Sequence, residues 1–182
     1  MDRIKKEGLE WIKAIIIGLI FFFIIHTFFF TNYVVEGNSM SPTLENGDKL
    51  IINKIIYRIG DIERFDIIVF HATEDEDYVK RVIGLPGDEI SYKNDQLFIN
   101  GEPVNEPFLD PTVKRGLVKF TNDFTLESIT GKKIIPEGYI FVMGDNRKDS
   151  YDSRHFGLIP IEKVIGKVAV RYWPFSDFDI SF

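Results

Sequence analysis

The sequence contains no cysteine among its 182 residues. That absence excludes disulfide bridges, thiolate zinc sites and cysteine nucleophiles in one step. It leaves the compartment open, because an exported protein can also lack cysteine. Any catalysis must therefore depend on hydroxyl, amine, imidazole or carboxylate groups.

Basic clusters are also missing after the first residues. The net charge is −6, with 22 Lys and Arg against 28 Asp and Glu. Nucleic acid requires a concentrated positive patch for its phosphates, so we expect no nucleic-acid partner. The length suits one domain with a small core, to which a subdomain can be added.

Helical periodicity is absent after the first thirty residues. Short runs rich in Val, Ile and Phe, punctuated by Gly, Pro, Asn and Asp, predict β-strands over residues 32–36, 49–54, 66–70, 78–84, 89–93, 96–100, 138–143 and 166–172. Asn94 and Asp95 form a two-residue loop that is typical of a hairpin. We predict an all-β fold, a compact antiparallel barrel or folded sheet, with a smaller inserted β subdomain over residues 89–135.

One long apolar run stands apart from this pattern. AIIIGLIFFFIIHTFFF, residues 14–30, carries no charge and one histidine, His26. With residues 9–13 it reaches about 20 residues, the length of a membrane-spanning helix. A buried helix would need a larger protein around it, and a cleaved secretory signal would need small residues after Phe30. We therefore predict an uncleaved transmembrane anchor over residues 9–30, with His26 as a structural residue near its outer end.

The basic residues predict how this anchor is oriented. Arg3, Lys5, Lys6 and Lys13 precede the apolar run, whereas Lys49 is the one basic residue in the twenty that follow it. Positive charge stays on the cytoplasmic side of a membrane span. We expect residues 1–8 in the cytoplasm, residues 9–30 in the lipid bilayer of the cell membrane, and residues 31–182 on its outer face.

A candidate nucleophile follows the first predicted strand. Ser39 lies in GNSMSPT, between Gly37 and Pro42. A tight turn of this kind can expose a hydroxyl and direct backbone N–H groups toward a developing oxyanion. Gly, Ser and Pro also make ordinary turns, so the motif by itself leaves both interpretations open.

A serine nucleophile needs a base, and the sequence offers two kinds. His71 and His155, both among acidic residues, would suit a conventional triad. Lys80 is the other candidate, because it lies in the apolar strand DYVKRVIG on the same face as Tyr78 and Val82. Burial there would lower its pKa and leave some neutral amine. The alternative is an exposed lysine on an edge strand.

A third polar cluster, GDNRKDSYDSR, occupies residues 144–154. A solvated loop is one interpretation. Asp145, Asn146, Asp149 and Asp152 also offer oxygen ligands, but their spacing lacks the alternating acidic positions and the final Glu of a calcium loop. We expect no metal here.

These clusters, in this order behind one apolar span, resemble the bacterial type I signal peptidase (leader peptidase) family, in its single-span Gram-positive form. The resemblance covers most of the chain outside the anchor and residues 89–135. Its segments are VEGNSMSPTL at 35–44, GDKLII at 47–52, RFDIIVF at 64–70, YVKRVIGLPGD at 78–88, and GDNR at 144–147 with Ser150, Asp152, Ser153, Arg154 and Gly157.

The resemblance implies a serine endopeptidase that removes signal peptides from secretory preproteins without a cofactor. By position, Ser39 would be the nucleophile and Lys80 the general base, a variant of triad chemistry. Ser150 would orient the Lys80 amine by a hydrogen bond. Asp152 and Arg154 would form a structural pair.

Two positions depart from the family pattern. Some members carry a Ser two residues before the nucleophile, and its hydroxyl completes the oxyanion hole, whereas Gly37 stands there in this chain. The oxyanion would then depend on the Ser39 backbone N–H and other groups of the turn. Phe65 replaces a usual Gly, which we expect to alter packing and not chemistry.

The family cuts after small residues at the −1 and −3 positions, which implies a shallow apolar pocket. Val35, Met40, Leu44, Tyr78 and Val79 lie closest to the catalytic pair in sequence and are expected to line it. An extended peptide would pair with the nearby strand edges. An anchor would hold the site near the membrane surface and raise the effective concentration of substrate.

Three other functions remain open. A serine hydrolase with His155 or His71 as base would not need Lys80. A membrane-tethered module that binds exported peptides would need neither Ser39 nor Lys80. A Ser-Lys protease that cuts itself or a regulatory partner would share the chemistry, but the anchor favours the signal peptidase.

Overall fold

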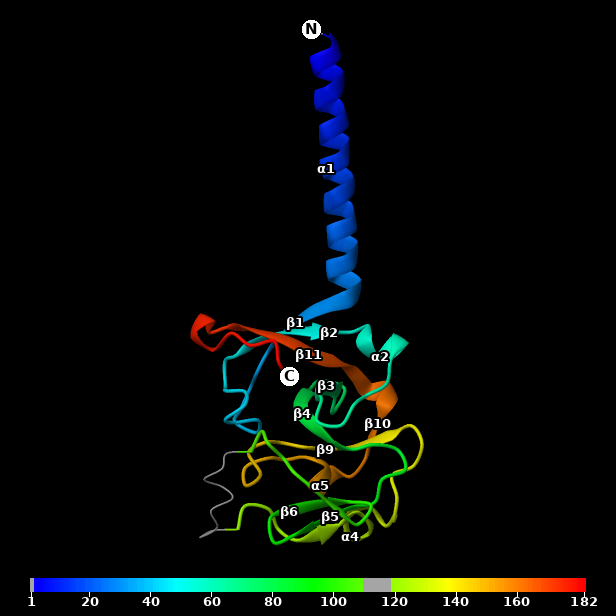
Figure 1. Ribbon diagram of the computed structural model, residues 1–182, viewed down its shortest axis with the longest axis vertical. Helices are drawn as coiled ribbons and strands as arrows, with labels where there is room; N and C mark the ends of the chain where they lie inside the picture. The colour runs from blue at the N-terminus through cyan, green and yellow to red at the C-terminus, as the bar shows by residue number, and fades with distance from the viewer. Residues whose placement is uncertain (1, 110–118) are drawn as a thin grey trace.

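The structure is a computed structural model that describes residues 2–109 and 119–182 (Figure 1). Its first element is the helix α1 (Asp2–Phe29), which projects away from a body made of strands. The helix leads directly into β1 (Phe30–Val34), so it ends one residue before the end of the predicted anchor. Among the residues whose side chains are described, no helix is long and apolar enough to span a bilayer.

The described part of the chain forms two sheets, and the larger has seven strands in the order β1-β2-β11-β3-β4-β9-β10, with antiparallel pairings throughout. The strands after β1 are β2 (Lys49–Asn53), β3 (Ile67–His71), β4 (Asp77–Gly84), β9 (Tyr139–Met143), β10 (Ile159–Pro160) and β11 (Val164–Trp173). Within the described residues, β1 and β10 form two unpaired edges, so the sheet is not closed into a barrel. Of the two predicted architectures, a barrel or a folded sheet, the structure therefore shows the folded sheet.

The smaller sheet has four strands in the order β7-β6-β5-β8. They are β5 (Ile90–Lys93), β6 (Gln96–Ile99), β7 (Glu102–Val104) and β8 (Phe124–Thr125). The predicted hairpin is confirmed, because Asn94 and Asp95 connect β5 to β6 with φ angles of 51° and 59°. Two-residue hairpin turns require such positive angles. All four strands fall within the predicted insert, of which residues 110–118 lie outside the described residues.

Residues 2–109 and 119–182 contain five short helices besides α1, four of them between strands and one after β11. They are α2 (Ile56–Ile59), α4 (Leu126–Thr130), α5 (Ser153–Phe156) and the 3-10 helices η1 (Ile161–Lys163) and η2 (Phe175–Asp177). Each has three to five residues, so no helical repeat is visible in the sequence. Side-chain caps define α4 and α5, where Thr125 and Asp152 accept from the first-turn N–H groups.

Alternation along β4 directs its side chains into different cores. Val79 packs into the core between β2, β3 and the segment after β1, whereas Tyr78 and Val82 belong to the core on the opposite face. Lys80 shares the face of Tyr78 and Val82, which carries it into the interior. A third core joins the two sheets, since Phe141 of β9 packs against the residues of the smaller sheet.

Candidate active site

Ser39 lies in the turn that follows β1, and backbone contacts hold it from two directions. Gly37 adopts a φ of +81°, and its N–H donates to the Asn46 side chain at 2.9 Å. From the other direction, the N–H of Asn146 donates to the Ser39 carbonyl at 3.0 Å, and the Asn146 amide donates to the Asn38 carbonyl at 3.1 Å. The turn of Ser39 is thereby tied to the polar segment 144–154.

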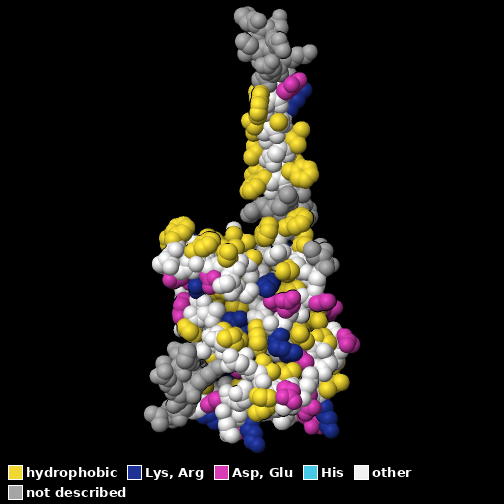
Figure 2. Space-filling view, in the orientation of Figure 1, with side chains coloured by type: hydrophobic (Ala, Val, Ile, Leu, Met, Phe, Trp, Pro, Cys, Tyr) yellow, Lys and Arg dark blue, Asp and Glu magenta, His cyan; other side chains and the backbone are white. Residues whose placement is uncertain are grey.

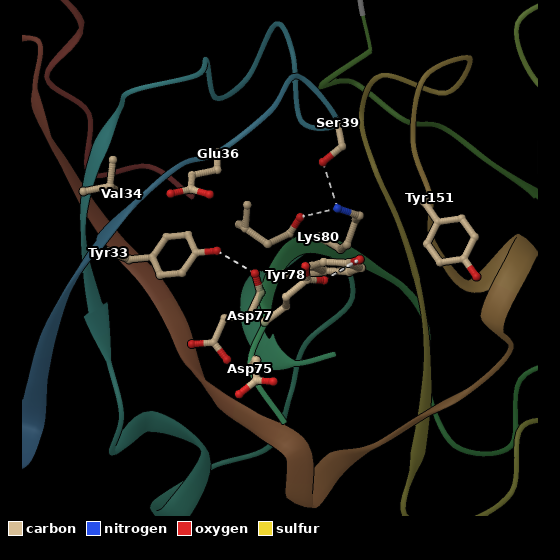
Figure 3. A pocket seen from close by; sticks show the side chains of 11 residues that line it. Tyr33, Val34, Glu36, Ser39, Asp75, Asp77, Tyr78, Lys80 and Tyr151 are labelled. Atoms are coloured by element: carbon tan, nitrogen blue, oxygen red, sulfur yellow. Dashed lines mark hydrogen bonds between the residues drawn. The ribbon is translucent and has the colours of Figure 1, made fainter. Parts of the chain in front are cut away.

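Lys80 reaches Ser39 from the middle of β4 (Figure 3). Its Nζ lies in hydrogen-bond contact with the Ser39 Oγ at 2.8 Å and donates to the Val79 carbonyl at 3.0 Å. The residue is only 4% exposed. The structure therefore supports a buried Lys80 over a lysine on an exposed edge.

Burial has a chemical consequence for this amine. It lowers the pKa of Lys80 from 10.5 to about 8, although the negative charge of Asp152 opposes the shift. A measurable share of the amine is therefore neutral near pH 7. A neutral amine at 2.8 Å from a hydroxyl can accept its proton, which is the requirement for a general base.

The Asp152 carboxylate organises the segment 144–154. It accepts hydrogen bonds from the Gly144 N–H at 2.9 Å, from the Ser150 hydroxyl at 2.7 Å and from the Arg154 guanidinium at 2.7 and 2.8 Å. Burial disfavours its charged form, but the hydrogen bonds and charge of Arg154, with the other donors, outweigh burial and lower the pKa of Asp152. The pair of Asp152 and Arg154 expected from the sequence is present.

Ser150 differs from its expected role, because its hydroxyl donates to Asp152 and not to Lys80. Within the described residues, both hydrogen bonds of the Lys80 amine go to Ser39 and Val79. An ionised carboxylate is a stronger acceptor and takes the single hydroxyl proton. Ser150 nevertheless lies beside the nucleophile, since a Cβ on Gly144 would come within 2.2 Å of the Ser150 Oγ and 2.3 Å of the Ser39 carbonyl.

A cavity of about 480 Å³ opens onto Ser39 and Lys80 (Figure 3). One wall comes from the end of β1 and the residues after it, and the other from residues 75–80, with Tyr151 beside Lys80. Within the described chain, β1 pairs only with β2, and residues 77–80 of β4 pair only with β3. Two strand edges at the cavity therefore lack a strand partner and can pair with an extended peptide, although on β4 the Val79 and Asp77 carbonyls already accept from the Lys80 amine and the Tyr33 hydroxyl.

The two histidines considered as alternative bases lie in other contacts. His71 Nδ1 is 2.7 Å from the Asp77 carboxylate, and His155 stacks on Tyr151 with ring centroids 5.1 Å apart. Within the described residues, neither ring forms a hydrogen bond with Ser39. The geometry therefore favours Lys80 as the partner of Ser39.

Comparison with known proteins agrees with this geometry. Residues 8–173 match the family described as "Signal peptidase, peptidase S26". The chain belongs to this family. It is 55% identical over 179 residues to signal peptidase I of Bacillus caldolyticus, with 98% of this chain and 97% of that protein covered. It is 43% identical over 183 residues to signal peptidase IB of Staphylococcus aureus strain MRSA252, with 98% and 96% covered.

A solved structure supports the same family. The crystal structure of a signal peptidase I from Enterococcus faecalis V583 is 42% identical, with a TM-score of 0.55, and the match covers 60% of this chain and 98% of that chain. The resemblance seen in the sequence is thus confirmed. The chain is a hydrolase of the S26 serine peptidase family, whose members cleave signal peptides.

The pocket residues expected for this signal peptidase family divide into two groups. Tyr78 and Val79 line the cavity. Val35, Met40 and Leu44 do not line it, because each is at most 2% exposed and packs in the core behind it. Nearness to Ser39 in sequence was a poor guide, since strand alternation turns Val35 inward while its neighbours face the cavity.

Reasoning from the sequence missed one buried ion pair next to the catalytic lysine. The Arg81 guanidinium binds both carboxylate oxygens of Asp145, at 2.9 and 2.7 Å, and donates to the Phe65 carbonyl at 2.8 Å. This pair fixes β4 to the first residues of the segment 144–154. The sequence contained one sign of this pair. Arg81 is a charged residue inside an apolar strand, and a buried charge needs a partner of opposite charge.

A second buried cluster joins the smaller sheet to the same segment. The Arg147 guanidinium contacts Glu106 and the Tyr92 hydroxyl, and its Nε donates to the Gly144 carbonyl at 3.0 Å. The Arg147 carbonyl in turn accepts from Arg154 at 2.7 Å. Nothing in the local sequence points to this cluster, because its members come from distant parts of the chain.

Four carboxylates at the mouth of the cavity were also not predicted as site residues: Glu36, Asp75, Glu76 and Asp77. Tyr33 bridges the two walls there, since its hydroxyl donates to the Asp77 carbonyl at 2.8 Å. Burial, with the nearby charges of Asp77 and Glu36, raises the pKa of Tyr33 to about 12. The hydroxyl therefore stays protonated and keeps its donor role at physiological pH.

Proposed function

We propose that this protein is a membrane-anchored serine endopeptidase that removes signal peptides from exported preproteins through a Ser39–Lys80 dyad. The observation that carries the proposal is the 2.8 Å contact between Lys80 Nζ and Ser39 Oγ. Burial lowers the pKa of this lysine to about 8, which suits it to act as a base. The family membership supports the class of substrate.

The reaction follows from this contact. The neutral Lys80 amine takes the Ser39 proton as Oγ attacks the scissile carbonyl carbon, and a tetrahedral intermediate forms. Its collapse breaks the C–N bond, and the Lys80 ammonium returns the proton to the leaving amine of the mature chain. Water, deprotonated by the same amine, then hydrolyses the acyl ester and releases the signal peptide. No metal or other cofactor takes part.

The oxyanion would be bound by backbone donors of the turn. Within the described residues, the Ser39 N–H donates to no protein acceptor, whereas the Gly37 N–H is occupied by Asn46. The Ser39 N–H is therefore the available donor at the nucleophile, and no hydroxyl stands at position 37 to assist it. A single backbone donor of this kind is worth on the order of 100-fold in rate.

The substrate would lie extended between the free edges of β1 and β4. Side chains of an extended peptide alternate between two faces, so its −1 and −3 residues point the same way. Val79 and the core behind it leave little depth on that face, which would restrict these positions to small side chains. Ser150, Asp152 and Arg154 support the site by holding the segment next to Ser39.

The lipid bilayer is the other proposed partner. The apolar run at residues 14–30 is long enough, with its flanks, to span a membrane, and the preceding positive charges would stay in the cytoplasm. Figure 2 shows hydrophobic side chains gathered at the end of the body that meets α1. The strand β11 lies at that end in Figure 1, and it ends at the exposed Trp173. Three more exposed apolar residues follow it, Phe175, Phe178 and Ile180. They support a single-pass enzyme whose body rests on the extracytoplasmic face of the cell membrane.

The proposal is tested by incubating the detergent-solubilised protein with a preprotein that carries an Ala-x-Ala site. We expect cleavage after the second Ala by the parent and by Lys93→Ala, which removes an exposed lysine outside the cavity. We expect none from Ser39→Ala or Lys80→Ala. Cleavage that survives Lys80→Ala would contradict the dyad, and no cleavage by the parent would indicate a binding module or another substrate class.

A further inference from the structure

A second hollow adjoins the catalytic cavity, and both are lined by Tyr78 and Tyr151. It measures about 270 Å³, and of its ten lining residues only Lys163 carries a charge. That volume lies below the roughly 300–1,000 Å³ of small-molecule sites, so it suits one large side chain better than a cofactor. We call it the apolar groove; its lining includes Phe70, Ala72, Tyr78, Tyr151, Phe156 and Leu158.

Ring contacts connect this groove to the catalytic lysine. The Tyr78 ring centroid lies 5.1 Å from Lys80 Nζ and 6.5 Å from the Phe156 ring, which lies 5.5 Å from Tyr151. Figure 3 shows Tyr78 and Tyr151 beside Lys80, on the side of the cavity opposite Tyr33. Tyr151 is 59% exposed, so its ring is available to a ligand that passes Lys80.

The proposed reaction indicates which part of the substrate lies here. Lys80 returns its proton to the leaving amine, and that amine is the first nitrogen of the mature chain. The mature chain therefore begins at Lys80 Nζ, next to Tyr78 and the entrance of the groove. We propose that the apolar groove binds one large apolar side chain from the first three residues of the mature protein. This inference rests on the proposed function.

The test uses the full-length protein in detergent and preproteins that share one signal peptide ending in Ala-x-Ala. Leu, Gly or Asp is placed at the first, second or third mature position, and kcat/KM is measured for each. We expect Leu to exceed Gly by roughly 10-fold at one position, the range for an apolar side chain in a hydrophobic pocket. Ala72→Leu, which fills the groove, and Leu158→Ser, which makes it polar, should each reduce that ratio to about 1.

Ile134→Ala is the matched control, because Ile134 is 55% exposed and lines neither the cavity nor the groove. Its ratio should equal that of the parent. A parent that shows no preference for Leu at any of the three positions would overturn the inference, as would a preference that survives both groove variants. Failure of the parent to cut any of these preproteins would overturn the proposed function, and the inference with it.

Discussion

Lys80 carries a charge into the interior without a carboxylate to bind it. Within the described residues its amine contacts a hydroxyl and a carbonyl, and Asp152 acts on it only through space. Structural lysines in cores are usually paired, because an isolated buried ammonium is costly. Burial without such a partner instead lowers the pKa of Lys80, and a lowered pKa is the property that an amine needs to act as a general base.

The pH dependence of cleavage should report this pKa. The neutral share of Lys80 shrinks as the pH falls below its pKa of about 8, so kcat/KM should fall about tenfold for each pH unit below that value and level off above it. Lys93→Ala should leave the profile unchanged. A fall in kcat/KM with a midpoint near pH 6.5, the ordinary pKa of histidine, would instead favour a histidine base.

Gly144 is a second position where one side chain matters. A Cβ there would lie 2.2 Å from the Ser150 Oγ and 2.3 Å from the Ser39 carbonyl, so Gly144→Ala must move the nucleophile. We expect kcat to fall about 100-fold, since displacement by about 1 Å can cost that much. Gly18→Ala is the control, because nothing lies within 4 Å of its added Cβ. Equal activity of both variants would contradict this account.

At the level of strands and turns, three arginines hold the segment 144–154 against its surroundings. Arg81 binds Asp145, Arg147 binds Glu106, and Arg154 binds Asp152; the exposed fractions of these side chains range from 0 to 13%. The fork of the guanidinium fixes orientation as well as distance. Three ion pairs therefore position the backbone that contacts Ser39. One partner lies on β4, one lies just after the strand β7 of the smaller sheet, and the third pair lies within the segment 144–154 itself.

Breaking one of these pairs should destabilise the fold. Asp145→Asn leaves Arg81 buried beside a neutral amide, and we expect unfolding to become easier by about 3–5 kcal/mol. Asp123→Asn removes a carboxylate from the exposed pair with Lys119 and should have little effect. Thermal unfolding in detergent measures both variants. A similar melting temperature for the two would show that the buried pair is not a determinant of stability.

For the protein as a whole, the position of its exposed apolar surface indicates how the body meets the membrane. Trp173 at the end of β11 is exposed, as are Phe175, Phe178 and Ile180 after it, whereas water would favour polar side chains there. Aromatic side chains are enriched where a protein meets the headgroups of a bilayer. The proposed anchor and these exposed apolar residues would together hold the cavity at a constant height above the membrane.

Tryptophan fluorescence can test that contact. The chain has two tryptophans, Trp11 and Trp173, so the Trp11→Phe variant reports on Trp173 alone. In liposomes that contain brominated lipid we expect its emission to be quenched, because Trp173 would lie at the headgroup level. The Trp173→Phe variant, which keeps Trp11, provides the reference for the anchor. Emission that brominated lipid leaves unchanged would contradict membrane contact by the body.

Local patterns determined much of the architecture from the sequence alone. Short runs rich in Val, Ile and Phe predicted the strands that became β2, β3 and β4, and Asn94 with Asp95 predicted the hairpin of the smaller sheet. These features depend on neighbours a few residues apart, so a single sequence contains them. The ordered motifs around Ser39 and Lys80 also sufficed to indicate the family.

Only the tertiary structure decided how the site is built. The acceptor of the Ser150 hydroxyl, the buried pair of Arg81 and Asp145, and the burial of Met40 away from the cavity all depend on how the sheet folds over itself. Such contacts join residues far apart in the chain, and each is set by competition among several donors and acceptors. Local preference contains no information about that competition, because the competitors meet only after the sheet has folded.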